Sequence, residues 1–106
     1  MAIKNRPVEL SLDQQIQRAE RARQILNDEV FSEAVERIEE ALLSGLRRSA
    51  FTDDKLREKL GQRYALLHDL LDQLNSTMQT GELARAQLEF DEKQSAFQKL
   101  RQVVGL

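Results

Sequence analysis

Cysteine and tryptophan are absent from this chain of 106 residues. Without cysteine, the chain forms no disulfide and offers no thiolate metal ligand and no cysteine nucleophile. Tyrosine occurs once and phenylalanine four times, so leucine, isoleucine, valine and alanine must build almost all of any hydrophobic core. Proline also occurs only once, and β-branched residues nowhere alternate with polar ones. We therefore expect essentially no β-sheet.

Long apolar runs and an excess of charge of one sign are also lacking. No run approaches the roughly 18 apolar residues of a membrane span, and the amino-terminal MAIKNRPVELS lacks the continuous apolar stretch of a signal peptide. The 16 basic and 18 acidic residues give a net charge of −2. Such a balance gives no general attraction to nucleic acid or to an anionic membrane. We expect a cytoplasmic protein that contacts neither.

The remaining composition is typical of long α-helices, with Leu and Ala among the apolar residues and Gln, Glu and Arg among the polar ones. The clearest pattern runs from 52 to 81, where apolar residues recur every three or four positions, on one face of a helix. These residues are Leu56, Leu60, Tyr64, Leu67, Leu71, Leu74 and Met78. Leu66 and Leu70 widen this stripe, which predicts a further contact for the helix.

Capping signals divide the rest of the chain. Residues 1–10 form an amino-terminal arm, either a flexible terminus or a segment that docks on a neighbouring subunit through Ile3, Val8 and Leu10. The pattern S-x-x-Q at Ser11 predicts a helix at about 11–26. Weak helix formers follow at Asn27 and Asp28, so residues 12–47 form either one kinked helix or two, the second at about 28–47.

Two further helices are expected after a turn near Phe51, whose ring we expect to point inward. The first spans about 53–79 and is ended by Gly81, because glycine is common just after the end of a helix. The last spans about 82–103. An antiparallel hairpin of 28–47 and 53–79 would place acidic residues beside basic ones. The expected pairs are Glu36 with Arg63, Glu39 with Lys59 and Glu40 with Arg57.

A heptad repeat runs along the last predicted helix. Its members are Leu83, Ala86, Phe90, Phe97, Leu100 and Val104, with Lys93 at the one polar position. An unbroken heptad with a polar member is typical of an oligomerising coiled coil. The alternative is that this stripe packs on the hairpin within the same chain. The predicted fold is thus all-α: an antiparallel hairpin with a third, C-terminal helix in a helical-bundle oligomer.

No constellation typical of an enzyme occurs. His68 is the only histidine, and with Asp72 one turn away it offers two ligands, too few for a metal site. The predicted helix at about 28–47 carries an acidic face, but its glutamates lack the Glu-x-x-His pairs of di-iron bundles. No phosphate-binding loop or nucleophile elbow is present. We expect a non-enzyme with no catalytic residue, no metal and no cofactor.

Basic residues around the turn leave one binding hypothesis. Arg47, Arg48 and Arg57 could contact an anion such as a phosphate. The alternative is that they pair internally with the acidic face, as the near balance of charge favours. Arg18, Arg21 and Arg23 form a second basic cluster, which lacks aromatic residues for base stacking.

The chain also resembles small helical proteins of tailed phages and prophages. The motifs are Ile25-Leu26, Asn27-Asp28, Phe31 to Ala34, Arg57-Glu58 and Gly81 to Ala84. They cover about 65 residues and are structural, so the resemblance implies phage origin but no active-site residue. The sequence departs from that family at Leu46, where many relatives carry Trp, and in its longer extension after the glycine.

From these patterns we expect a structural protein that assembles through helix-to-helix contacts. Its partners would be copies of itself and a larger phage structural protein, in a virion or in head assembly in the host cytoplasm. The predicted contact residues are Leu66, Leu70, Leu83, Phe90, Phe97 and Leu100. The alternative is a phage-encoded protein that inhibits or sequesters a host defence component or a nucleotide ligand.

Overall fold

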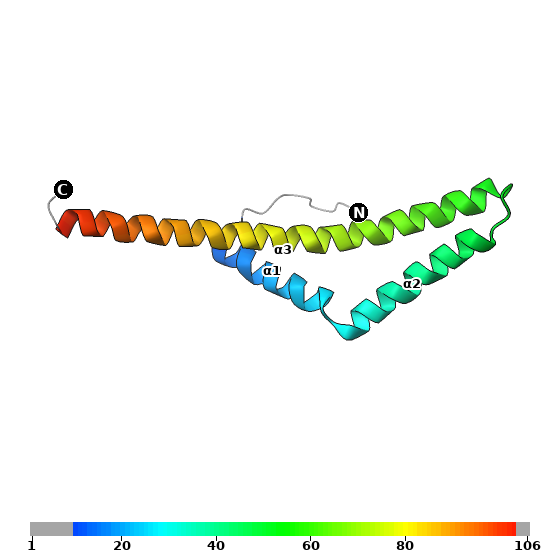
Figure 1. The fold of residues 1–106 in the computed structure, drawn as a ribbon, viewed down its shortest axis with the longest axis horizontal. Helices are drawn as coiled ribbons and strands as arrows, with labels where there is room; N and C mark the ends of the chain where they lie inside the picture. Colours follow the sequence, from blue (N-terminus) through cyan, green and yellow to red (C-terminus); the bar gives the residue numbers. More distant parts are fainter. Residues whose placement is uncertain (1–9, 104–106) are drawn as a thin grey trace, which may run out of the picture.

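The computed structural model describes residues 10–103, and this part of the chain contains three α-helices and no strand. The helices are α1 (Leu12–Leu26), α2 (Glu29–Arg48) and α3 (Asp54–Val103) (Figure 1). The predicted all-α fold is therefore confirmed. Ile3 and Val8 of the amino-terminal arm and Val104 of the heptad lie outside the described residues.

Side chains just before α1 and α2 explain where these helices begin. The Ser11 hydroxyl accepts a hydrogen bond from the Gln14 backbone N–H at 3.2 Å, and the Gln14 side chain accepts from the Ser11 N–H at 3.0 Å. The Asp28 carboxylate accepts from the Phe31 N–H at 2.8 Å and starts α2 directly after Asn27, which ends α1. Residues 12–47 therefore form two helices.

α3 continues without a break through Gly81, so the predicted helices 53–79 and 82–103 are one helix of 50 residues. A separate C-terminal helix was thus a wrong prediction. Gly81 is buried in the middle of α3, because α1 crosses it at that point. The Thr77 hydroxyl donates to the Gln73 carbonyl oxygen at 3.0 Å within this continuous stretch of α3.

The long helix α3 organises the molecule, and α1 and α2 follow one another along it (Figure 1). Both run antiparallel to α3, α2 against its first part and α1 against its middle. The buried apolar residues are Ala22, Leu42, Leu60, Leu67 and Ala84, and no side chain in the described range is completely buried. The radius of gyration is 22.2 Å, against about 13 Å for a compact domain of this length.

The antiparallel hairpin of α2 and α3 is confirmed, but its register differs from the expected one. A Cβ atom on Gly45 would lie 3.2 Å from Leu60 Cδ1, so Leu60 packs directly on the Gly45 backbone. Glu39 faces His68 at 3.6 Å, and Glu40 pairs with Arg47 at 2.8 Å. The predicted acid–base pairs across the hairpin were wrong, because the packing of Leu60, rather than the turn, sets the register.

The turn between α2 and α3 also differs from the expectation. Phe51 is 90% exposed instead of pointing inward. The Asp53 N–H donates to the Ala50 carbonyl oxygen at 2.9 Å and closes the turn, while the Asp53 carboxylate accepts from the Leu56 N–H at 3.2 Å. Asp53 therefore caps α3.

Candidate self-association surface

α3 extends well beyond the two helices that cover it. Its buried side chains begin at Leu60 and end at Ala84, and every residue from Glu89 to Val103 is exposed. We call residues 89–103 the arm (Figure 1). A helical segment as short as the arm is only marginally stable in water without tertiary contacts, because little packing offsets its conformational entropy. A contact along the arm would supply the missing stabilisation.

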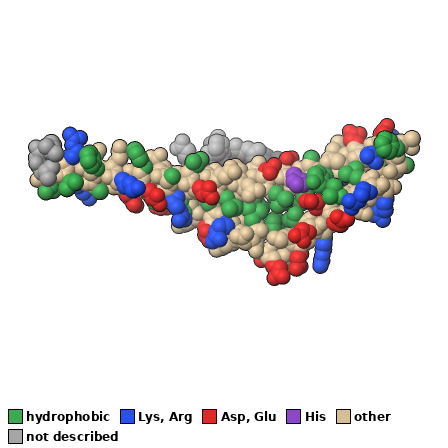
Figure 2. Space-filling model, viewed as in Figure 1, with side chains coloured by type: hydrophobic (Ala, Val, Ile, Leu, Met, Phe, Trp, Pro, Cys, Tyr) green, Lys and Arg blue, Asp and Glu red, His purple; other side chains and the backbone are tan. Residues whose placement is uncertain are grey.

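A row of apolar side chains follows α3 into the arm. Phe90 and Phe97 are 55% and 60% exposed, and Leu83 and Leu100 are 73% and 59% exposed. With Ala86 and Lys93 they occupy consecutive a and d positions of a heptad repeat. We call these six residues the seam. In Figure 2 apolar side chains mark the arm out to its end.

The seam points away from α1. At about 100° per residue, Leu83 and Phe90 lie roughly 140° around the axis of α3 from Gly81 and Ala84, which are buried beneath α1. One interpretation of the heptad had this stripe packing on the hairpin of the same chain. The exposure of Leu83, Phe90, Phe97 and Leu100 rules that arrangement out.

Leu66 and Leu70 form a second exposed apolar surface, which we call the flank. Their exposed fractions are 69% and 51%, although the neighbouring Leu67 is buried. The flank lies roughly 170° around the helix axis from the centre of the seam. The six predicted contact residues therefore fall on two separate surfaces of one helix.

Arg57, predicted as an anion contact, completes the end of α2. Its guanidinium donates to the Leu46 carbonyl oxygen at 3.2 Å and to the Ser49 hydroxyl at 2.8 Å. The same group lies 5.3 Å from the centre of the Phe51 ring. Because the last carbonyls of a helix lack intrahelical partners, a cation here stabilises both the carbonyl and the helix dipole.

Arg47 and Arg48 also have partners within the chain. Arg47 pairs with Glu40 on the preceding turns of α2, and both side chains are about two-thirds exposed. Arg48 donates to the Ser44 carbonyl oxygen at 3.4 Å. The structure thus brings the three predicted anion contacts to one end of the hairpin and gives each an intramolecular partner.

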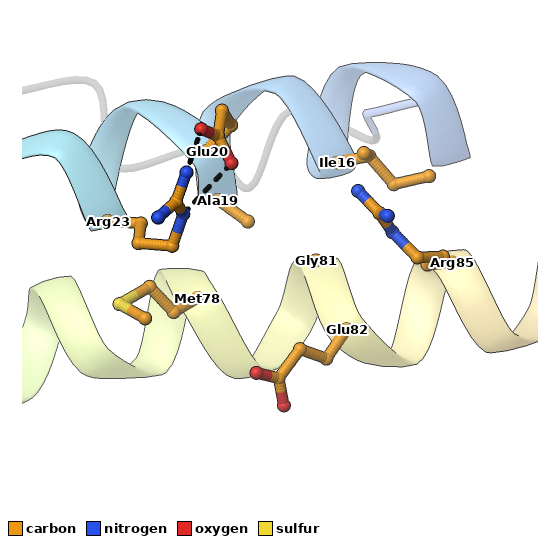
Figure 3. Close-up of a pocket in the computed structure, with 8 residues that line it drawn as sticks. All are labelled: Ile16, Ala19, Glu20, Arg23, Met78, Gly81, Glu82 and Arg85. Atoms are coloured by element: carbon orange, nitrogen blue, oxygen red, sulfur yellow. Dashed lines mark hydrogen bonds and ion pairs between the residues drawn. The ribbon is translucent and has the colours of Figure 1, made fainter.

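α1 approaches α3 closely where it crosses Gly81 (Figure 3). A Cβ atom on Gly81 would overlap the Ala19 Cβ and lie 3.1 Å from the Gln15 carbonyl oxygen. Ala22 and Ala84 are both 3% exposed and lie one turn further along their own helices. This contact was not predicted from the sequence. The matching small residues, Ala19 and Ala22 in α1 and Gly81 and Ala84 in α3, are the signal that could have revealed it.

Charged side chains line a shallow groove beside this crossing. Arg23 forms an ion pair with Glu20, and Arg85 reaches toward α1 from α3 (Figure 3). The hydrogen bond from Arg23 lowers the pKa of the Glu20 carboxyl, and the positive charges of Arg23 and Arg85 act in the same direction. Glu20 in turn raises the pKa of Arg23. Both side chains are about half exposed, so the pair is screened by water.

His68 packs against Tyr64 of its own helix and faces Glu39 of α2. Its ring centre lies 4.4 Å from that of Tyr64, and its Nε2 atom is buried 3.6 Å from a Glu39 oxygen. Within residues 10–103, no group of three or more His, Asp and Glu side chains is placed to hold a metal ion.

No family model matches this chain, and no curated protein or solved structure is significantly similar to it. Over the described residues, no helix combines the length and the apolar character that a membrane span requires.

Proposed function

We propose that this protein is a non-enzymatic helical assembly protein that acts by self-association through the seam. The observation that carries the proposal is the row of Leu83, Phe90, Phe97 and Leu100, each more than half exposed. Burial of apolar surface stabilises a complex by about 25 cal/mol per Å². Contiguous apolar surface of this kind is typical of an interaction site.

The thin core supports the same proposal. Leu42, Leu60 and Leu67 are the only large apolar side chains among the described residues that are 9% exposed or less. A chain of this length normally buries most of its leucine and phenylalanine on folding. Pairing with a second copy would add the seam residues to the buried surface and stabilise the arm.

The flank provides a second contact, which points in a different direction from the seam. A rod with two separate apolar surfaces can join more than two molecules, as a structural protein must. We propose that Leu66 and Leu70 contact further copies or a larger phage structural protein, in a virion or in head assembly. The sequence resemblance to small helical phage proteins is the support for this setting.

The alternative function, sequestration of a nucleotide or a host defence component, has less support. It would use cations at the turn, and Arg57 is engaged by the Leu46 carbonyl and the Ser49 hydroxyl. Arg47 and Arg48 have partners in α2. Assembly is therefore the function that we favour.

Size-exclusion chromatography with light scattering tests the proposal. At tens of micromolar we expect a mass of two or more chains, and Phe90→Gln shifts it toward one chain. Phe51→Gln is the matched control, because Phe51 is also exposed but lies in the turn outside the seam. A wild-type protein that stays monomeric at this concentration would overturn the proposal.

A further inference from the structure

We infer that the seams of two copies pair in antiparallel orientation, with a two-fold axis passing between Asp91 and Glu92. This inference rests on the proposed self-association and adds the orientation and register of the pair. The order of the seam residues and the charges of residues 82–103 both favour this pairing.

The order of side-chain sizes along the seam fits an antiparallel pair. In an antiparallel coiled coil, each a position faces a d position of the other helix. An axis between Asp91 and Glu92 places Leu83 opposite Leu100 of the partner subunit. It places Phe97, the bulky residue near one end, opposite the partner's Ala86, the small residue near the other. Large side chains therefore face small ones, as close packing requires.

Lys93, the one polar member of the seam, also finds a suitable neighbour in this register. It lies opposite Phe90 of the partner subunit, and the axis repeats this contact on the other side. A lysine ammonium over an aromatic ring is an attractive arrangement, and the lysine stem covers apolar surface while its charge reaches water. The residue that interrupts the apolar heptad is thereby accommodated.

The charge on either side of the axis also fits an antiparallel pair. Residues 82–92 carry four carboxylates and one arginine, a net charge of −3, and residues 93–103 carry two lysines and one arginine with no carboxylate, a net charge of +3. Antiparallel pairing about Asp91 and Glu92 lays each acidic half along the basic half of the other copy. The net charges of the facing halves are therefore opposite. Glu82, Glu89, Lys93 and Arg101 lie toward the seam, whereas Asp91, Glu92 and Lys99 lie on the far side of the arm.

A parallel pair in register has none of these advantages. It places Lys93 against Lys93 of the partner subunit and sets like-charged halves side by side. The helix dipole explains the cations near Val103, where α3 ends, but not the acidic cluster at 82–92, which lies far from the start of the helix. The acidic residues 82–92 and the basic residues 93–103 thus both favour the antiparallel pair.

The surroundings of the seam leave room for the second helix. α1 contacts α3 at Gly81 and Ala84, on the side nearly opposite Leu83 and Phe90. In the inferred register the partner's arm runs along this uncovered side, past the crossing. α3 would then lie between α1 of its own chain and the arm of the other copy.

Disulfide cross-linking tests the orientation, since the chain contains no cysteine. Leu83→Cys and Leu100→Cys are each oxidised alone and as an equimolar mixture after joint refolding. We expect cross-linked dimers in the mixture only, because two copies of residue 83 would lie about 25 Å apart along the axis. A parallel pair would instead cross-link each variant with itself.

Spin labels provide a second measurement that spares the seam. Glu92→Cys and Gln102→Cys are exposed positions outside the six seam residues. We expect labels at residue 92 to lie nearly level and labels at residue 102 to be displaced by about 30 Å along the axis. A parallel pair would give short distances at both positions, and so would overturn the inference even if the cysteine variants of the seam dissociate.

The two proposals fail in different ways. A monomer in light scattering removes both. A dimer with parallel distances removes the antiparallel pairing and leaves self-association standing.

Discussion

The Ala19 Cβ occupies the space that a side chain at Gly81 would fill. Both residues lie in the interior of their helices, so neither backbone moves easily to make room. The crossing of α1 over α3 therefore depends on a glycine at this position. At Gly61, in the same helix, a Cβ atom would meet nothing within 4 Å apart from the adjoining backbone of α3. The two glycines have opposite expected effects.

Gly81→Ala should destabilise the protein. The added methyl group forces α1 away from α3, at a cost of about 1–3 kcal/mol for an overpacked contact. Urea unfolding followed by circular dichroism measures the change. An unfolding midpoint equal to or above that of the wild type would show that α1 does not pack here.

Gly61→Ala is the matched control and should stabilise the protein by up to about 1 kcal/mol. Alanine is the better helix former, and the open space around residue 61 accepts its methyl group. The same urea titration measures this gain. A loss of stability would mean that another chain covers Gly61 in solution.

Arg57→Gln should loosen the end of α2. The substitution removes the charge-assisted hydrogen bonds to the Leu46 carbonyl and to the Ser49 hydroxyl, and we expect a loss of about 1–2 kcal/mol. Hydrogen exchange at the last turn of α2 should accelerate. Arg63→Gln, which removes a charge one and a half turns further along α3, should change neither quantity appreciably.

The Glu20–Arg23 pair predicts a small dependence of stability on pH. The pKa of Glu20 lies below its ordinary value of 4.5 in the folded chain. The pair therefore contributes its stabilisation above the ordinary pKa, and this is lost as the pH falls through the lowered value. An NMR titration of the Glu20 side chain should give a midpoint below 4.5 in the wild type and a higher one in Arg23→Gln. Arg21→Gln, on the exposed face of α1, should leave the midpoint unchanged.

Lys93→Leu should strengthen self-association. Leucine completes the apolar heptad and adds about 1 kcal/mol at each of two symmetric sites, so the dissociation constant should fall roughly tenfold or more. Sedimentation equilibrium measures it. Ser95→Leu places the same side chain on the far side of the arm and should have little effect; equal effects of the two changes would argue against the seam.

Hydrogen exchange should reveal the arm directly. Below the dissociation constant, backbone amides of residues 92–103 should exchange rapidly, because no tertiary contact protects that part of α3. Above it, they should become protected. Amides around Leu67 should be protected at both concentrations, since α2 covers them in the single chain.

Local patterns predicted the helices and most of their ends. Ser11 and Asp28 act through hydrogen bonds within three residues, so their effect is legible in the sequence. The stripe from Leu60 to Met78 likewise depends only on helical spacing. The seam followed from its heptad, and the structure adds that no other part of the described chain covers it.

The errors arose where a distant residue decides the outcome. In the local sequence Gly81 is typical of a helix end. Its place inside α3 is explained by its contact with Ala19 of another helix, which the local sequence does not show. Phe51 was expected inside because it is apolar, but the turn offers it only the guanidinium of Arg57. The hairpin pairs were misassigned because Leu60, packing on Gly45, sets a register that charge alone does not specify.

The unbroken course of α3 has a mechanical consequence. Fifty residues at 1.5 Å each form a stiff rod of about 75 Å, with a hairpin near one end and the seam near the other. The residue count between Ala84 and Phe90 alone fixes how the two ends are oriented. A single residue inserted there would turn the arm by about 100° relative to α1. The rod thus fixes both the distance and the rotation between the arm and the hairpin, and a rotation imposed on the arm is transmitted to the hairpin.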